Sequence, residues 1–293
     1  LTSCWSLVSG PGAVTFGNPG QPMTTASFST SGVYVLRLMA DDGGQSAVDD
    51  MTVTVEQDDI AVGRLPSSGL RIWVKADAGV TTDPNGKVSA WLDRTSHTND
   101  FFQSLTNYRP VYVTNSLNGK PVVRFVTNYL NGVYSPSNEL TVFVVRKFNI
   151  FNAWWQAIYD SHQWGTNVSG GLLYGILPSN QLLAQTGQGG TWCDGVDYAG
   201  DVAMTTNWSV DALRIGATQT EAWADTAQVM TTNVGAITKG KILMLGRNEQ
   251  AGWYFLGDIA ELVVYDRALT DAERTQTEDY LMFKRGFNRP PAV

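Results

Sequence analysis

The chain is poor in charge and in reactive side chains. Of its 293 residues only 16% are charged, and it has two cysteines and two histidines. Cys4, Cys193, His97 and His162 do not stand in the spacing of a zinc site. The two cysteines therefore leave two alternatives, a single disulfide or two buried thiols, since sequence alone does not give disulfide connectivity.

Positive clusters and long apolar runs are also missing. The formal net charge is −7, and the 20 Lys and Arg residues form no patch that could neutralise phosphates. No apolar run approaches the roughly 20 residues of a spanning helix, and the first residues contain neither a charged start nor an apolar signal core. We therefore expect neither nucleic acid nor a membrane as a partner.

Catalytic motifs are the third absence. The chain has no nucleophile elbow, Walker loop or dinucleotide fingerprint. The nearest acid pairs are Glu221 with Asp225 and Asp258 with Glu261. The first has an even spacing but would be about 13 Å apart along a strand, and neither pair fits the close carboxylates that a retaining glycosidase needs. His162 is a lone histidine beside an aromatic residue. We expect no catalytic residues and no enzymatic activity, and we expect Glu261 to form a structural hydrogen bond or ion pair.

What the chain has in quantity is turn residues and aromatic rings. It contains 29 Gly, 11 Pro, 10 Trp, 11 Tyr and 11 Phe. In residues 1–57, short alternating segments such as 33–38 and 51–55 are separated by turn signals about every ten residues. This pattern predicts an all-β fold, beginning with a small β-sandwich.

Residues 5–16 (WSLVSGPGAVTF), 26–38 (ASFSTSGVYVLRL) and 41–43 (DDG) resemble the later strands of a PKD-type immunoglobulin-like domain. The resemblance implies an incomplete sandwich over residues 1–57, because such domains normally have one or two strands before the tryptophan. Either the chain is a fragment, or a neighbouring subunit, the second domain or other residues of the protein supply those strands at the open edge beside Thr2 to Val8. The inward residues would be Trp5, Phe16, Phe28, Tyr34, Leu36 and Leu38.

A second domain is expected over residues 70–287, after a linker at 58–69 and before a proline-rich tail at 288–293. Its many short strands favour one large two-sheet sandwich. Only its end reads as a helix: Thr270 and Glu273 form a capping box, Lys284 and Arg285 suit a helix C-terminus, and Gly286 is a natural stop.

This second domain resembles the concanavalin A-like, laminin G-like jelly-roll modules of large secreted bacterial proteins. The resemblance rests on residues 70–80 (LRIWVKADAGV), 88–93 (VSAWLD), 109–110 (RP), 118–125 (NGKPVVRF) and 256–274 (LGDIAELVVYDRALTDAER). It implies a jelly-roll sandwich with one C-terminal helix. It implies little about function, since this fold serves lectins, adhesins and carbohydrate-active enzymes alike.

Aromatic rings interspersed with amides and carboxylates are concentrated between residues 154 and 198. Flat rings stack on the C–H faces of sugars and amides bind their hydroxyl groups, so the composition fits a glycan-binding surface. The alternative is that the rings fill the core, to which we assign Trp73, Trp91 and Trp208. The candidate ligand-binding residues are Trp155, Tyr159, Gln163, Trp164, Tyr174, Trp192, Tyr198 and Trp253.

A metal site is a further candidate. Asp194, Asp197 and Asp201 lie in a glycine-containing stretch that would suit a structural calcium ion. The alternative is that no cofactor is bound and the stretch is a solvated acidic loop.

These observations lead to a functional hypothesis with two alternatives. The leading one is a secreted or cell-surface, non-catalytic module that binds a polysaccharide or other glycan, with the first domain as a spacer. The second is a structural or adhesive subunit of a bacterial cell-surface assembly, which would receive a strand from a neighbouring subunit. The third is a jelly-roll glycoside hydrolase or polysaccharide lyase.

Overall fold

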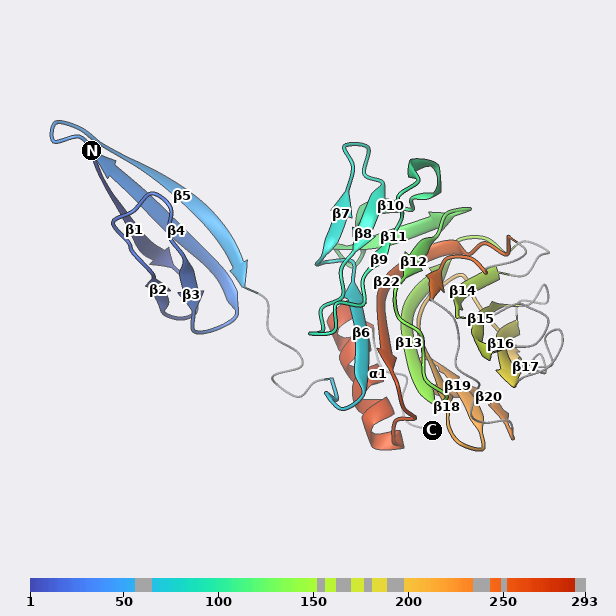
Figure 1. Cartoon of the computed structure of the whole chain (residues 1–293). Helices are drawn as coiled ribbons and strands as arrows, with labels where there is room; N and C mark the ends of the chain where they lie inside the picture. The colour runs from blue at the N-terminus through green and yellow to red at the C-terminus, as the bar shows by residue number, and fades with distance from the viewer. Residues whose placement is uncertain are drawn as a thin grey trace. The chain divides into compact units, whose positions relative to one another are not determined.

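The computed structural model describes residues 1–55, 65–151, 156–161, 170–176, 181–188, 198–233, 243–248 and 252–287. The chain forms two compact units, Leu1–Gly63 and Arg64–Val293. Strands dominate both units, and the C-terminal helix α1 (Asp271–Arg285) is the one α-helix of the described residues (Figure 1). The predicted all-β class with a C-terminal helix is confirmed.

The first unit combines a three-stranded sheet with a hairpin. The antiparallel sheet has the order β1-β4-β5, and β2 pairs with β3. The strands are β1 (Thr2–Ser9), β2 (Val14–Phe16), β3 (Ala26–Phe28), β4 (Gly32–Asp41) and β5 (Ser46–Val55).

Aromatic contacts pack the hairpin onto the sheet. The ring centroids of Trp5 and Phe16 are 6.4 Å apart, and those of Phe28 and Tyr34 are 4.8 Å apart. The Tyr34 hydroxyl donates to the Thr30 carbonyl at 2.6 Å, in the manner of the tyrosine corner of immunoglobulin-like sandwiches. Tyr34 and Leu36 are buried, so the predicted inward face of this strand is confirmed.

Other apolar side chains of this unit are exposed. Leu7 and Met51 both pair across the sheet with Leu36, yet they are 38% and 47% exposed. At the edge of β1, the Trp5 backbone N–H donates to the Pro19 carbonyl at 2.8 Å. Cys4 is exposed with a free thiol, whereas Cys193 lies outside the described residues. That another chain or segment adds strands here stays a prediction.

The second unit is a sandwich of two antiparallel sheets (Figure 1). We call the eight-stranded one the back sheet. Its spatial order is β10 (Val111–Leu117), β11 (Lys120–Val126), β22 (Leu256–Tyr265), β13 (Leu140–Phe148), β18 (Trp208–Ile215), β19 (Thr220–Ala224) and β20 (Ala227–Thr232), and β6 (Leu70–Lys75) also pairs with β22.

The nine-stranded sheet is called the front sheet. Its order is β17 (Tyr198–Ala203), β16 (Gln181–Gln188), β15 (Gly170–Ile176), β14 (Gln156–Asp160), β21 (Met244–Leu245), β12 (Leu130–Gly132), β9 (Phe101–Phe102), β8 (Val88–Trp91) and β7 (Val80–Thr82). A short 3₁₀-helix, η1 (Thr106–Tyr108), follows β9.

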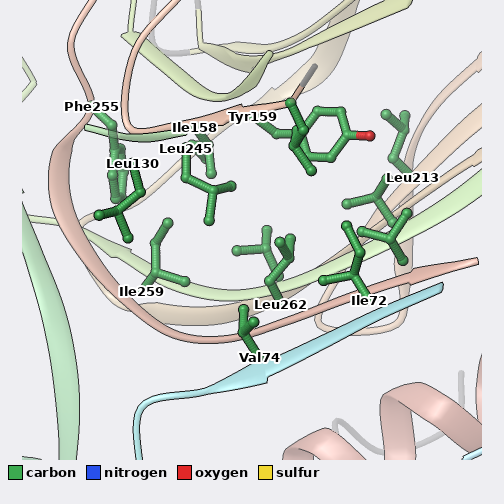
Figure 2. Close-up of a cluster of buried hydrophobic side chains, with 14 of the residues drawn as sticks. Ile72, Val74, Leu130, Ile158, Tyr159, Leu213, Leu245, Phe255, Ile259 and Leu262 are labelled. Atoms are coloured by element: carbon green, nitrogen blue, oxygen red, sulfur yellow. The ribbon is translucent and has the colours of Figure 1, made fainter. Parts of the chain in front are cut away.

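The hydrophobic core fills the space between the two sheets. In Figure 2, Leu130, Ile158 and Leu245 of the front sheet face Ile259 and Leu262 of the back sheet. Their alternation with outward-facing residues is what a two-sided sandwich requires. Of the tryptophans assigned to the core from sequence, Trp73 and Trp91 are buried. Trp208 is only partly buried, because it is the first residue of β18 and follows the exposed residues 205–207.

Helix α1 is held on the back sheet by a buried ionic cluster. Glu261 is fully buried and accepts from Trp73 Nε1 at 2.6 Å, Lys284 Nζ at 3.0 Å and Arg285 Nη2 at 2.5 Å. The capping box of Thr270 is formed, and Gly286 ends the helix with φ 72°. The predicted structural role of Glu261 and the predicted helix limits are confirmed.

A second buried ion pair lies between the sheets. Arg146 of β13 donates from Nε and Nη2 to the two Asp211 oxygens at 2.7 and 2.8 Å, and each side chain is about 1–2% exposed. Ser209 donates to Asp211 at 2.7 Å, and the Arg146 guanidinium lies 4.7 Å from the Phe148 ring centroid. The bidentate geometry offsets the loss of hydration of both charges.

The β19–β20 hairpin provides a test of backbone strain. Its two-residue loop, Asp225 and Thr226, has φ values of 49° and 71°, as a type I′ turn requires. A β-branched residue is disfavoured in this region, so we expect Thr226→Gly to raise the free energy of unfolding by about 0.5–1 kcal/mol. Urea unfolding measures the change.

The matched control for this turn is Thr231→Gly in the adjacent strand β20. There the backbone is extended, so glycine should lower stability by about 0.5–1 kcal/mol. If both substitutions destabilise the protein alike, Thr226 is not strained.

Candidate functional site

Strand pairing brings three distant segments together at one end of the front sheet. Asn131 of β12 pairs with Phe102 of β9 on one side and with Met244 of β21 on the other. The residues that follow β9, precede β12 and follow β21 therefore meet at neighbouring strand ends, about 4.8 Å apart from strand to strand.

These segments form a stack of aromatic rings around one arginine. The Tyr108 and Tyr129 ring centroids are 5.5 Å apart at an interplanar angle of 46°. The Arg247 guanidinium carbon lies 4.4 Å from the Tyr129 centroid and 5.8 Å from that of Tyr254. We call these four residues the tyrosine–arginine cluster. Since Tyr129 contacts both Tyr108 and Arg247, it supports the cluster, and Tyr108 is its exposed ring, with 40% of its surface accessible.

Hydrogen bonds fix the segment that carries Tyr108. The Tyr129 backbone N–H donates to the Tyr108 carbonyl at 3.1 Å, and Gln103 Nε2 donates to the Tyr129 carbonyl at 3.3 Å. Arg109 donates to the carbonyls of Gln103 and Ser104 at 2.8 and 3.1 Å. A platform of this kind is preorganised, so binding would not have to order it.

Backbone geometry fixes the other two segments. Gly246 has φ 88°, and a Cβ there would lie 2.3 Å from Phe125, so glycine is required where the chain turns toward Arg247. Thr127 has φ 86°, which is strained for a β-branched residue, two positions before Tyr129. Such strain persists where the surroundings fix the backbone, and it is common at binding sites.

The chemistry of this surface suits stacking rather than proton transfer. Residues 101–108, 126–134 and 252–257 contain no Asp, Glu, His, Lys or Arg. They contribute rings together with the amides of Asn107 and Asn128, of which Asn107 is exposed and Asn128 partly buried. Rings beside amides can bind a ligand that has apolar faces and hydroxyl groups.

The residues predicted from sequence are placed in three ways. Trp253 is partly exposed and directly precedes Tyr254 of the cluster, with its backbone N–H bound to Asn248 Oδ1 at 3.0 Å. Tyr159 is a correction: it is fully buried in the core, where burial raises the pKa of its hydroxyl, so its ring offers no face to a ligand (Figure 2). Trp155, Gln163, Trp164 and Trp192 lie outside the described residues, as do the side chains of Tyr174 and Tyr198.

The calcium prediction also stays untested. Asp194, Asp197 and the side chain of Asp201 are outside the described residues. Among the residues that are described, no group of three or more His, Cys, Asp or Glu side chains is placed to hold a metal ion. The described helix is too short and too polar to cross a membrane.

Sequence reasoning missed Tyr108, Tyr129, Arg247 and Tyr254. They are spread over residues 108–254, so no local window contains them together. A usable signal was the absence of charge around Tyr129, in residues 126–134 (VTNYLNGVY).

Comparison with known proteins agrees with the two-unit architecture. Residues 2–55 match the K319L-like PKD domain. The matched residues are those of the β1–β5 unit, and the resemblance of this unit to a PKD domain noted from sequence is confirmed. A comparison with curated proteins found no match.

Solved structures show the fold of the second unit. The binding domain of Paraclostridial Mosquitocidal Protein 1 is 8% identical over 73% of this chain and 52% of its own, with a TM-score of 0.54. Domain 4 of AbnA, an extracellular GH43 arabinanase from Geobacillus stearothermophilus, is 14% identical, and the match covers 73% of this chain and 99% of the domain, with a TM-score of 0.51. Trypanosoma rangeli sialidase is 10% identical, and the match covers 86% of this chain and 43% of the sialidase, with a TM-score of 0.52.

At these identities the likeness is one of fold, and the second unit is a jelly-roll β-sandwich. The chain spans about half of the mosquitocidal protein's domain structure and less than half of the sialidase.

Proposed function

We propose that the protein is an extracellular, non-catalytic glycan-binding module, with the tyrosine–arginine cluster of the jelly-roll as its binding surface and the PKD domain as a spacer. The observation that carries this proposal is the exposed Tyr108 ring, backed by Tyr129 and Arg247 and bordered by amides. Rings in this setting stack on the C–H faces of sugars.

Two further observations support it. Domain 4 of the arabinanase, which the match covers over 99% of its length, was solved in complex with arabinotriose, so a domain of this fold binds a sugar in another protein. The segments that form the cluster contain no carboxylate or histidine that could act as a general acid or base. PKD domains are typical of extracellular proteins, which supports a secreted or cell-surface location.

The test of this function is Tyr108→Ala. A glycan array that carries oligosaccharides of arabinan, xylan and cellulose should give binding by the unaltered protein, and the variant should bind the same sugar about tenfold more weakly. Because Tyr108 is 40% exposed, its truncation should change stability by less than about 1 kcal/mol, which thermal unfolding measures.

Phe283→Ala is the matched control. Phe283 is an aromatic residue of α1, the helix that packs on the back sheet, and its side chain is 77% exposed. It should leave glycan binding unchanged. If no sugar on the array binds, or if the two variants weaken binding equally, the cluster is not a glycan site, and the alternative of a structural or adhesive subunit gains support.

A further inference from the structure

An apolar strip extends from the cluster along the chain segment that contains Tyr108. Phe102, Leu105 and Tyr108 are 45%, 57% and 40% exposed, at intervals of three residues. Leu105 is the N-cap of η1, with an extended backbone at φ −81° and ψ 111°, and Tyr108 is the last residue of η1. The Tyr108 backbone N–H donates to the Leu105 carbonyl at 3.0 Å, and three residues of such a turn advance about 6 Å along the axis. That spacing is close to the length of one sugar unit in a chain.

The strip is held rigidly although its side chains are exposed. Between the exposed residues, Gln103 is buried, and its Oε1 accepts from the Leu105 backbone N–H at 3.1 Å. Arg109 closes the segment through two backbone carbonyls and an ion pair with Asp83 at 3.4 Å. Exposed apolar side chains on a fixed backbone mark a surface for contact with a ligand.

Charge is almost absent from this surface. Residues 101–108, 126–134 and 252–257 contain no Asp, Glu, His, Lys or Arg. The Arg109 guanidinium is bound to Asp83 and to two carbonyls, and the Arg247 guanidinium is packed against two rings and bound to the Asn248 carbonyl. A carboxylate or sulfate placed on the strip would lose hydration without gaining a counter-charge from these segments. The surface therefore favours an uncharged ligand.

We propose that Phe102, Leu105 and Tyr108 bind successive units of an uncharged polysaccharide. The bound units would lie within the polysaccharide rather than at one of its ends. The inference rests on the proposed glycan-binding function and adds the charge and the length of the ligand. A row of exposed side chains accommodates a continuing chain at both ends, whereas recognition of a terminal sugar calls for an enclosed pocket with convergent polar groups.

The test uses calorimetric titration with named probes: arabino-, xylo- and cello-oligosaccharides of two and six units, and hexagalacturonate as the acidic probe. At least one neutral hexasaccharide should bind about tenfold more tightly than its disaccharide, and hexagalacturonate should bind more weakly. Raising NaCl from about 50 to about 500 mM should change the affinity for the neutral hexasaccharide by less than about twofold, since no ion pair between protein and ligand would be screened.

Variants then separate the subsites. Phe102→Ala and Leu105→Ala should each weaken hexasaccharide binding about three- to tenfold and leave disaccharide binding within about twofold, whereas Tyr108→Ala should weaken both. Phe283→Ala again serves as the control, and thermal unfolding confirms that each variant is folded.

Different failures are distinguishable. If the disaccharide and hexasaccharide bind equally, or if hexagalacturonate binds best and high salt weakens it, this inference is wrong while the glycan-binding function stands. If none of the probes binds, both fail.

Discussion

Glu261→Ala should destabilise the second unit by about 3–5 kcal/mol. The substitution would leave Arg285 and Lys284 without their shared carboxylate and Trp73 Nε1 without its acceptor, all of them buried or nearly so. Removing one partner from a buried ionic cluster has an effect of this size, because Asp77, which lies 3.4 Å from Arg285 Nη1, would then compensate only part of the positive charge. Urea unfolding followed by tryptophan fluorescence measures it.

The same cluster predicts a pH dependence. Burial by itself would raise the pKa of Glu261, but Lys284, Arg285 and the Trp73 hydrogen bond together hold it below its ordinary value. A lowered pKa in the folded state contributes stability above the ordinary glutamate value of about 4.3, and this contribution is lost as the pH falls through the folded-state pKa. The difference in free energy of unfolding between the unaltered protein and Glu261→Ala should therefore become smaller as the pH is lowered from about 7 to about 3.

Asp271→Asn is the control for this cluster. Asp271 pairs with Arg214 at 2.7 Å at the start of the same helix, but its side chain is 78% exposed. Its replacement should change stability by less than about 1 kcal/mol. An equally small loss for Glu261→Ala would show that the buried cluster does not hold α1 to the sheet.

Asp211→Ala should also destabilise the second unit by about 3–5 kcal/mol. Arg146 is about 1% exposed and donates to both Asp211 oxygens, so the substitution would leave a guanidinium buried without its carboxylate. The contact of the Arg146 guanidinium with the Phe148 ring compensates only partly, since a desolvated cation–π contact contributes about 2 kcal/mol. Chemical unfolding at neutral pH gives the value.

A double variant separates the charge from the packing. Arg146→Met with Asp211→Leu replaces the ion pair by apolar side chains, and buried pairs replaced in this way often keep or gain stability. The double variant should be more stable than Asp211→Ala by at least about 2 kcal/mol. If it is as unstable as the single variant, shape rather than charge governs this position.

Local sequence signals sufficed for the all-β class and for the helix. The alternation in residues 33–38 lies in β4, which is buried at Tyr34 and Leu36, whereas residues 51–55 lie in β5, in which Val53 and Val55 are partly buried and Met51 is exposed. The capping box and Gly286 fixed α1, because helix ends depend on contacts within a few residues. The structural role of Glu261 was expected from its position just before a buried-looking strand, whereas its partners Lys284, Arg285 and Trp73 came from the structure.

Tyr159 shows why the site was harder to predict than the fold. Composition alone does not tell an exposed ring from a core ring, and Tyr159 pairs with Leu245 on the face that looks into the sandwich. Trp253 was chosen for its glycine and glutamine neighbours, and it lies beside a partly exposed ring cluster because the chain turns there at Gly252 and Gly246.

The sequence by itself determined the all-β class, the two units, the limits of the helix and the scarcity of charge. These properties depend on composition and on contacts between near neighbours, which a linear pattern records. Only the tertiary structure decided that Tyr108, Tyr129, Arg247 and Tyr254 meet. Their segments come together because β9, β12 and β21 are neighbours in the front sheet, and pairing between strands more than 100 residues apart depends on the packing of the whole sandwich, which no local pattern encodes.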